Sequence, residues 1–295
     1  VYTEMVSAAA LAHGSSPTRH LMETIAGEGK TALQIFGSNE SDFLLSMRGL
    51  GRETEQRFCE INLNAGCPMT RITREGAGAK LVENPEKVYR LLRIIKENTS
   101  LPVTLKTRLG PHPGKTMIFE LVSAAESAGA SGVIVHARYT SQMHGGPTGL
   151  ETLAEVVAKS SLPITGNGSV VDRKSAQAMA ATGVDAIMIG RAALGDPYIF
   201  SRIKAGSQIH PFSGSEICRR HLKYILEFQS RLSSTFPDDH IPSPDAFAAV
   251  KMHTHLFRYF NGRPGAAKLR ARLNTVRSIR EIESVLAGFE NGDGG

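Results

Sequence analysis

The sequence has no long apolar segment and few cysteines, and these two features exclude several classes of protein. No run of 18 apolar residues occurs in the chain, so no membrane-spanning helix is predicted. Cys59, Cys67 and Cys218 are odd in number and far apart. This excludes a disulfide framework and a zinc pair, and it predicts a reducing, cytoplasmic setting. The first residues have no basic region and no small-residue cleavage site, so we expect no signal peptide.

Acidic residues are absent from one long stretch near the C-terminus. The chain has a formal net charge of +6, of which +5 lies in residues 201–295. A concentrated positive surface most often binds nucleic acid, although a solvated basic helix face would have the same composition. Residues 251–280 contain no Asp or Glu, and their cations are Lys251, Arg258, Arg263, Lys268, Arg270, Arg272, Arg277 and Arg280.

Short β-rich segments recur through the first 200 residues at the spacing of a βα unit. Helical patterns such as Pro85–Asn98 and Thr116–Ala128 lie between them. This alternation predicts a parallel sheet with right-handed crossovers. The predicted strands are Val1–Ser7, Ala32–Gly37, Cys59–Asn64, Pro102–Arg108, Gly132–Ala137, Pro163–Gly166 and Asp185–Gly190.

The predicted fold class is α/β, a (β/α)8 TIM barrel followed by a small all-α helical domain. A closed barrel of this type has eight strands. Because the first of the seven segments begins at residue 1 without an initiator Met, we expect the first βα unit to be missing from this chain. An open doubly wound sheet is the alternative, weakened by the lack of a strand–GxGxxG–helix fingerprint. We place the barrel at residues 1–205 and the helical domain at residues 206–295, with helices at Ser215–Ser230, Asp245–Asn261, Ala266–Leu273 and Ser278–Phe289.

Polar residues gather at the ends of the predicted strands, where TIM barrels carry their active sites. An inward Lys106 needs a partner for its charge, which a bound anion or an electron-rich ring would supply. Glycines in the last two loops would let backbone amides approach an anion beneath Arg191, or they only turn tight corners. The polar set is Gln34, Asn64, Cys67, Lys106, Arg108, His136, Arg138, Asn167, Gly168, Gly190 and Arg191.

Cys67 lies in the segment Asn62–Pro68, at the predicted barrel mouth. A thiol there could be a nucleophile, a metal ligand, a proton donor or an inert buried group. No ligands at metal spacing lie nearby, so we expect no metal. An ordinary thiol is mostly protonated at neutral pH, which suits a proton donor. We assign Cys59 and Cys218 to packing.

At these residues the chain resembles the tRNA-dihydrouridine synthases, flavoproteins that reduce uridine in tRNA to 5,6-dihydrouridine. The matches follow the chain order and cover nearly all of it, although the family's first strand, with a Pro-Met-Ala-Gly-like segment, has no counterpart here. The matching segments are Tyr2–Ser7, Leu33–Gly37, Ile61–Pro68, Val103–Arg108, Val135–Arg138, Gly166–Gly168, Met188–Ala192 and Tyr259–Arg270.

The resemblance implies an FMN-binding barrel, a helical tRNA-binding domain and NADPH as the reductant. Hydride would pass to C6 of a flipped-out uridine while Cys67 protonates C5. Lys106, and His136 if protonated, would favour the negative charge of a reduced flavin. By resemblance, the FMN contacts would be Gln34, Lys106, His136, Asn167, Gly168, Ser169, Gly190 and Arg191.

The resemblance also suggests which residues meet the substrate. Asn64 and Arg138 would hold the pyrimidine edge, with Arg108 beside them. We expect a cytoplasmic monomer whose partner is tRNA. Two rival functions remain, an FMN-barrel dehydrogenase acting on a free pyrimidine and a non-catalytic RNA-binding barrel. The tRNA phosphates would be bound by Lys251, Arg258, Arg270 and Arg277.

Overall fold

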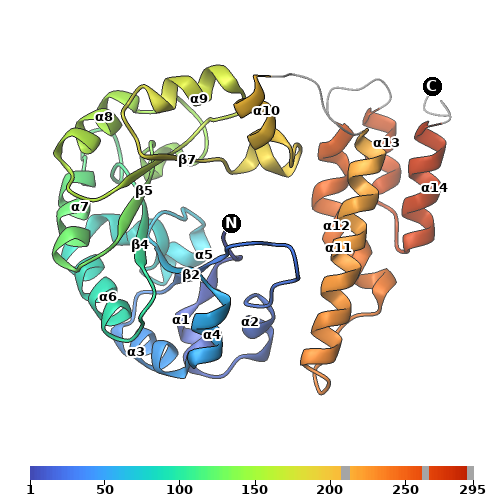
Figure 1. Ribbon diagram of the computed structural model, residues 1–295, viewed down its shortest axis with the longest axis horizontal. Coiled ribbons are helices and arrows are strands. Elements are labelled where there is room, and N and C mark those ends of the chain that lie inside the picture. The colour runs from blue at the N-terminus through green and yellow to red at the C-terminus, as the bar shows by residue number, and fades with distance from the viewer. Residues whose placement is uncertain (207–212, 261–265, 291–295) are drawn as a thin grey trace. The chain divides into compact units, whose positions relative to one another are not determined.

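The computed structural model describes residues 1–206, 213–260 and 266–290 of the chain. The chain forms two compact units, Val1–Ile189 and Gly190–Gly295 (Figure 1). Within the described ranges, no helix is both long and apolar enough to cross a membrane.

A parallel sheet forms the centre of the first unit. Its strands pair in chain order from β1 to β7, and each neighbouring pair is parallel. All seven predicted strands are present, and the sheet alternates with helices, so the predicted TIM-barrel class is confirmed. The strands are β1 Val6–Ser7, β2 Ala32–Phe36, β3 Glu60–Asn64, β4 Val103–Arg108, β5 Gly132–His136, β6 Ile164–Asn167 and β7 Ala186–Met188.

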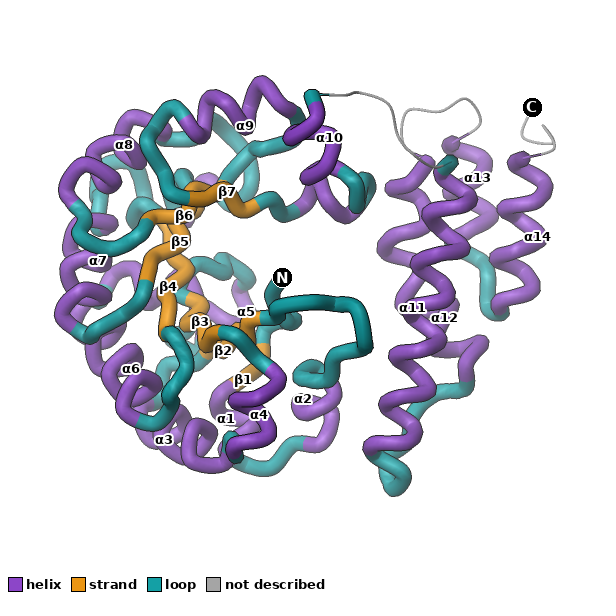
Figure 2. The backbone as a smooth tube through the Cα atoms, viewed as in Figure 1, coloured by secondary structure: helices purple, strands orange, loops and turns teal. Residues whose placement is uncertain are grey.

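Helices cover one face of this sheet. In α6, the Asn84 side chain accepts a hydrogen bond from the Lys87 N–H, and Pro85 fits the first turn, so the helix begins there. Figure 2 shows helices α3, α6, α7, α8 and α9 around the strands. The helical segments are α1 Ala8–Ala12, α2 Ser16–His20, α3 Glu40–Gly49, α4 Arg52–Arg57, α5 Thr70–Arg74, η1 Gly78–Glu83, α6 Pro85–Glu97, α7 Ile118–Ser127, η2 Thr140–Gln142, α8 Leu150–Lys159 and α9 Arg173–Ala180.

The strands alternate apolar and polar residues where they cross the barrel. Leu33 and Ile61 line a small pocket with Met47 of α3, so these side chains face the helices. Because successive side chains of a strand point to opposite faces, the intervening Gln34 and Asn62 face the barrel interior. The interior of this barrel is therefore polar, and its polar layer leads toward the strand ends.

The second unit is helical. All four predicted helices are present where the structure describes them, while Gly262–Gly265 and Asn291–Gly295 lie outside the described residues. The unit begins at Gly190 and therefore includes η3 and α10, residues that the sequence analysis placed with the barrel. The segments are η3 Arg191–Leu194, α10 Ile199–Ala205, α11 Gly214–Thr235, α12 Pro244–Leu256, η4 Phe257–Phe260, α13 Ala266–Leu273 and α14 Ile279–Glu290.

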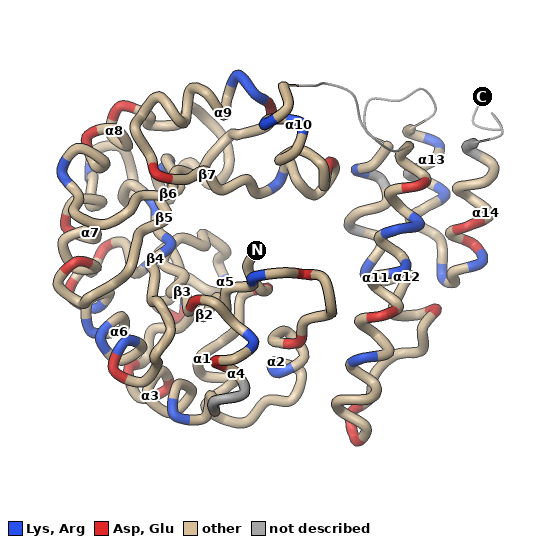
Figure 3. The backbone as a smooth tube through the Cα atoms, in the orientation of Figure 1, with Lys and Arg blue, Asp and Glu red and all other residues tan. Residues whose placement is uncertain are grey.

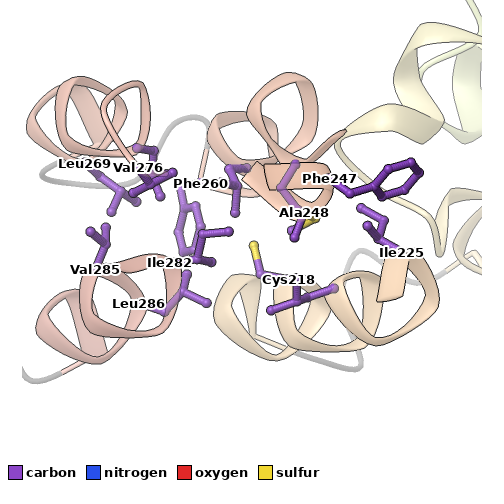
Figure 4. Close-up of a cluster of buried hydrophobic side chains, with 14 of the residues drawn as sticks. Cys218, Ile225, Phe247, Ala248, Phe260, Leu269, Val276, Ile282, Val285 and Leu286 are labelled. Atoms are coloured by element: carbon purple, nitrogen blue, oxygen red, sulfur yellow. The ribbon is translucent and has the colours of Figure 1, made fainter. Parts of the chain in front are cut away.

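An apolar core joins these helices (Figure 4). Cys218 is buried against residues such as Phe260 and Leu286, and burial raises the pKa of its thiol to about 12. Cys218 thus packs as predicted. Cys59 is exposed, because it precedes β3 rather than lying within it, so the prediction that it packs is wrong.

Candidate active site at the strand ends

Ten of the predicted site residues lie in the first unit, within strands β2 to β6, at their carboxyl ends or in the loops that follow. Parallel strands that pair in order bring these ends to one edge of the sheet. The group is Gln34, Asn64, Cys67, Lys106, Arg108, His136, Arg138, Asn167, Gly168 and Ser169.

A chain of side-chain hydrogen bonds crosses the strands beneath this edge. Asn64 Nδ2 donates to Gln34 Oε1 (2.9 Å), and Gln34 Nε2 donates to Asn62 Oδ1 (2.7 Å). Asn62 Nδ2 donates to Thr104 Oγ1 (2.7 Å), whose hydroxyl donates to Glu60 Oε1 (2.5 Å). Every donor points toward the Glu60 carboxylate, which can only accept. The carboxylate therefore sets the orientation of each amide in the chain.

This orientation holds the loop that carries Cys67. With its Nδ2 engaged by Gln34, Asn64 presents its Oδ1 to the loop. That oxygen accepts hydrogen bonds from the backbone N–H groups of Gly66 (3.1 Å) and Cys67 (3.0 Å). The position of the thiol is thus tied to the polar layer of the barrel interior. The sequence-based prediction does not include Glu60, Asn62 and Thr104, although polar residues recur at every second position in both β3 and β4.

Thr104→Val should loosen this loop. Valine keeps the shape of threonine but cannot accept from Asn62, so the amides above it lose their fixed orientation. We expect the Gly66 and Cys67 amide protons to exchange with solvent about tenfold faster, measured by hydrogen–deuterium exchange. Thr104→Ser keeps the hydroxyl and should exchange like the wild type. Equal exchange in all three proteins would show that the hydrogen-bond chain does not hold the loop.

Arg108 ties the Cys67 loop to the loop after β5. Its side chain is 1% exposed. Nε donates to Gly66 O (2.7 Å), while Nη1 donates to Tyr139 O (3.2 Å) and Met143 O (2.8 Å). These acceptors are neutral carbonyls, so they satisfy the guanidinium hydrogen bonds without balancing its charge. Arg108 therefore fixes two loops and leaves positive charge between them.

Arg138, which lies two residues after the end of β5, makes a second connection, from the loop after β5 to the loop after β6. Its guanidinium donates to Gly146 O (2.8 Å) and to Ser169 Oγ (2.6 Å). Its Nη1 also lies 3.3 Å from His136 Nε2. Because a guanidinium has only donors, His136 Nε2 must accept and the ring proton sits on Nδ1. The structure thus brings Arg138 onto His136 and Ser169, two of the predicted cofactor residues.

Burial and mutual repulsion lower the pKa values of the basic groups here. Burial, and then Arg108, lowers the pKa of Lys106 to about 8. Burial lowers the pKa of Arg108 to about 10. Burial, followed by Arg108, Lys106 and Arg138, lowers the pKa of His136 to about 2. His136 is therefore neutral at neutral pH. The positive charge of the site comes from Lys106, Arg108 and Arg138, and not from a protonated His136.

The site fits an anionic, ring-shaped ligand such as FMN. A cation that is partly withdrawn from water gains from a counter-charge, and in the part of the chain that the structure describes the half-buried Lys106 ammonium has no hydrogen bond or ion pair within the protein. His136 offers a neutral N–H beside it. Gly168 has φ +130°, and a Cβ there would lie 3.1 Å from Thr148 Cγ2 and 3.2 Å from His136 Cδ2, so only glycine lets this loop pack so closely against the His136 ring. Among the described residues, no group of three or more His, Cys, Asp or Glu side chains is placed to hold a metal ion.

Two non-glycine residues in the described chain have left-handed backbone angles, and both lie in loops at this edge. They are Ser169 (φ 53°) and Met143 (φ 52°). Met143 occupies the second position of a tight turn closed by a 2.9 Å hydrogen bond from Gly145 N to Gln142 O. Glycine is the usual residue at such a position, and another residue costs about 1–3 kcal/mol. Strain of this kind collects at functional sites.

The remaining predicted site residues belong to the second unit. Figure 3 marks Lys and Arg in blue along the helices of this unit. Gly190 and Arg191 are exposed, and Arg191 begins η3. Lys251 lies on α12, with its Nζ 5.9 Å from the Phe247 ring centre. Arg277 is exposed and donates to Val276 O (2.9 Å). Arg258 lies in η4 and Arg270 in α13, where the side chain of Arg270 is outside the described part. Their binding roles stay predictions.

Comparisons with known proteins show which family the chain matches. Residues 1–289 match the family model for dihydrouridine synthases. The chain is 27% identical to a probable tRNA-dihydrouridine synthase of Treponema pallidum, over 97% of this chain and 84% of that protein. It is 28% identical to tRNA-dihydrouridine synthase B of Escherichia coli, over 98% of this chain and 88% of that protein.

Similar solved structures include mandelate oxidases, one of them with benzaldehyde. They are 20% and 21% identical, with TM-scores of 0.40 and 0.42. The match covers 68% of this chain and 57% of theirs. The family model, by contrast, covers almost the entire sequence. The resemblance seen in the sequence is confirmed, and the chain belongs to the dihydrouridine synthase family of oxidoreductases.

Proposed function

We propose that this protein reduces the C5–C6 double bond of specific uridines in tRNA to give 5,6-dihydrouridine, with FMN as cofactor and NADPH as reductant. Family membership supports the reaction. The observation that carries the site assignment is the cationic cluster of the half-buried Lys106 and the buried Arg108 and Arg138, beside Cys67 and the neutral His136. We also propose that the protein acts in the cytoplasm as a monomer.

The residues present would hold FMN by its ring and its phosphate. Lys106 and the Nδ1–H of His136 would face electron-rich ring atoms. Glycine-lined loops and Arg191 would take the phosphate. When bound, the flavin supplies the hydride that C6 of the uracil receives. The proposed contacts are Gln34, Lys106, His136, Asn167, Gly168, Ser169, Gly190 and Arg191.

Cys67 would supply the proton that C5 receives. Donation leaves a thiolate, which the positive charges of Lys106 and Arg108 stabilise, because both interact electrostatically with this cysteine. The thiolate then regains a proton from water.

Asn64, Arg108 and Arg138 would position the substrate base. Asn64 already uses its Oδ1 for the Cys67 loop, and its Nδ2 donates to Gln34 and to Met5 Sδ (3.1 Å). A thioether is a weak acceptor, so the uracil edge would replace the contact with Met5. Arg108 would act through the loops that it holds.

The direct test combines the purified protein, NADPH and tRNA transcribed without modification. We expect a yellow protein and dihydrouridine at defined positions by mass spectrometry. A free-pyrimidine dehydrogenase would instead reduce uracil or uridine, and a non-catalytic RNA-binding barrel would bind tRNA without flavin absorbance or NADPH oxidation. Either result would replace the proposed function with that rival.

The basic run should contribute phosphate contacts that salt weakens. Arg277→Gln removes one exposed cation but keeps a donor for Val276 O. We expect weaker tRNA binding and a slope of log K against log salt that is smaller by about one unit. The matched control is Lys174→Gln on the exposed side of α9. An unchanged slope for the Arg277 variant would remove this residue from the tRNA interface.

A further inference from the structure

Met143 combines a strained backbone with an exposed side chain. It sits at φ 52° and ψ −99° in the turn from Gln142 to Gly145. These angles match the second position of a type II′ turn, where glycine is the usual residue. The side chain is 47% exposed. Packing of this side chain in the core of the fold therefore does not explain why a methionine stands here.

The surrounding loop holds this conformation firmly. Gln142 Oε1 accepts from Tyr139 N (2.8 Å), and Gln142 Nε2 donates to Pro147 O (3.0 Å). The buried Arg108 donates to Met143 O (2.8 Å). Strained residues persist only where their surroundings over-determine them, and they cluster at ligand contacts. These contacts hold the loop in a conformation that leaves the Met143 side chain exposed to solvent.

The Arg108 guanidinium links the Met143 loop to the loop that carries Cys67. Arg108 bonds Gly66 O, next to Cys67, and Met143 O at the same time. The exposed thioether thus belongs to a loop that is tied to the proton donor through one buried side chain. Methionine is unbranched and polarizable, so it adapts to flat aromatic surfaces. Nucleic-acid bases offer such surfaces when a nucleotide leaves its stack.

We propose that Met143 is a substrate-binding residue whose thioether packs against the face of a tRNA base, either the target uridine or its neighbour. This inference rests on the proposed function and adds a contact that phosphate-binding cations cannot make. The proposed contact also explains why methionine and not glycine stands at this strained position. A glycine would allow the same turn but would have no side chain to contact the base.

Met143→Gly separates stability from binding. Glycine accepts the left-handed angles, so the melting temperature should stay level or rise by about 2–4 °C. Loss of the base contact should raise the Kd for unmodified tRNA about tenfold, measured with the flavin-loaded protein in the absence of NADPH. Flavin content should not change. A Kd within about twofold of the wild type would overturn the proposal.

Two further variants keep the test independent of the turn. Met143→Leu retains an apolar side chain and should bind tRNA like the wild type. Met143→Gln retains the length but not the apolar character, and should weaken binding about fivefold. Leu45→Ala, which trims an exposed residue of α3, controls for loss of apolar surface. Equal affinities for Met143→Gln and Met143→Leu would overturn the proposal, whereas failure of the wild type to bind tRNA would overturn the proposed function with it.

Discussion

Cys67→Ala should lower the rate of dihydrouridine formation by about 10²- to 10⁴-fold, the range for loss of a positioned acid. Asn64 holds the backbone N–H of Cys67, and the cations Lys106 and Arg108 interact electrostatically with its thiol. Removing it leaves hydride transfer without a proton for C5. The measurement is a single turnover of pre-reduced protein with unmodified tRNA, with the product quantified by mass spectrometry.

Flavin content and tRNA affinity should survive this change, because alanine preserves the backbone N–H that Asn64 accepts. Cys59→Ala is the matched control, since that thiol is exposed and precedes β3. It should turn over like the wild type. If the Cys67 variant made dihydrouridine at the normal rate, the proton would have to come from another group or from water.

The sequence was sufficient to predict the strands and the edge where the site lies. Strand β4 shows why: Val103 and Leu105 alternate with Thr104 and Lys106, and the burial of the apolar pair follows from that period. The polar residues at the strand ends then meet because parallel strands share one direction. The order and direction of the strands are therefore enough to predict the edge of the sheet at which the site lies.

Other features depended on contacts between segments far apart in the chain. The neutral state of His136 arises from burial and from cations of β4 and of its own loop. The turn at Met143 carries no glycine at its strained position, and the glycines that follow it would predict a turn slightly later. The exposure of Cys59 depends on the residue at which β3 begins. Each of these needs three-dimensional proximity that spacing alone does not give.

Lys106→Met should weaken FMN binding about ten- to a hundredfold, because hydrogen bonds to charged groups contribute about 1.5–3 kcal/mol each. The same change should stabilise the flavin-free protein. Burial lowers the pKa of Lys106 from 10.5 to about 8, so below pH 8 the folded state carries an unfavourable charge. Removing that charge should add roughly 3 kcal/mol to the free energy of unfolding at pH 7.

The stability difference between Lys106→Met and the wild type should depend on pH. Between pH 8 and pH 10.5 the folded wild type releases the Lys106 proton while the unfolded chain keeps it, so wild-type stability rises with pH relative to the variant. The advantage of Lys106→Met should therefore be full at pH 7 and small at pH 10, as measured by urea unfolding of the flavin-free proteins. Lys174→Met, at an exposed position of α9, should show no such trend. If Lys106→Met were more stable than the wild type by the same free energy at both pH values, or less stable at pH 7, Lys106 would not carry an uncompensated positive charge in the flavin-free protein.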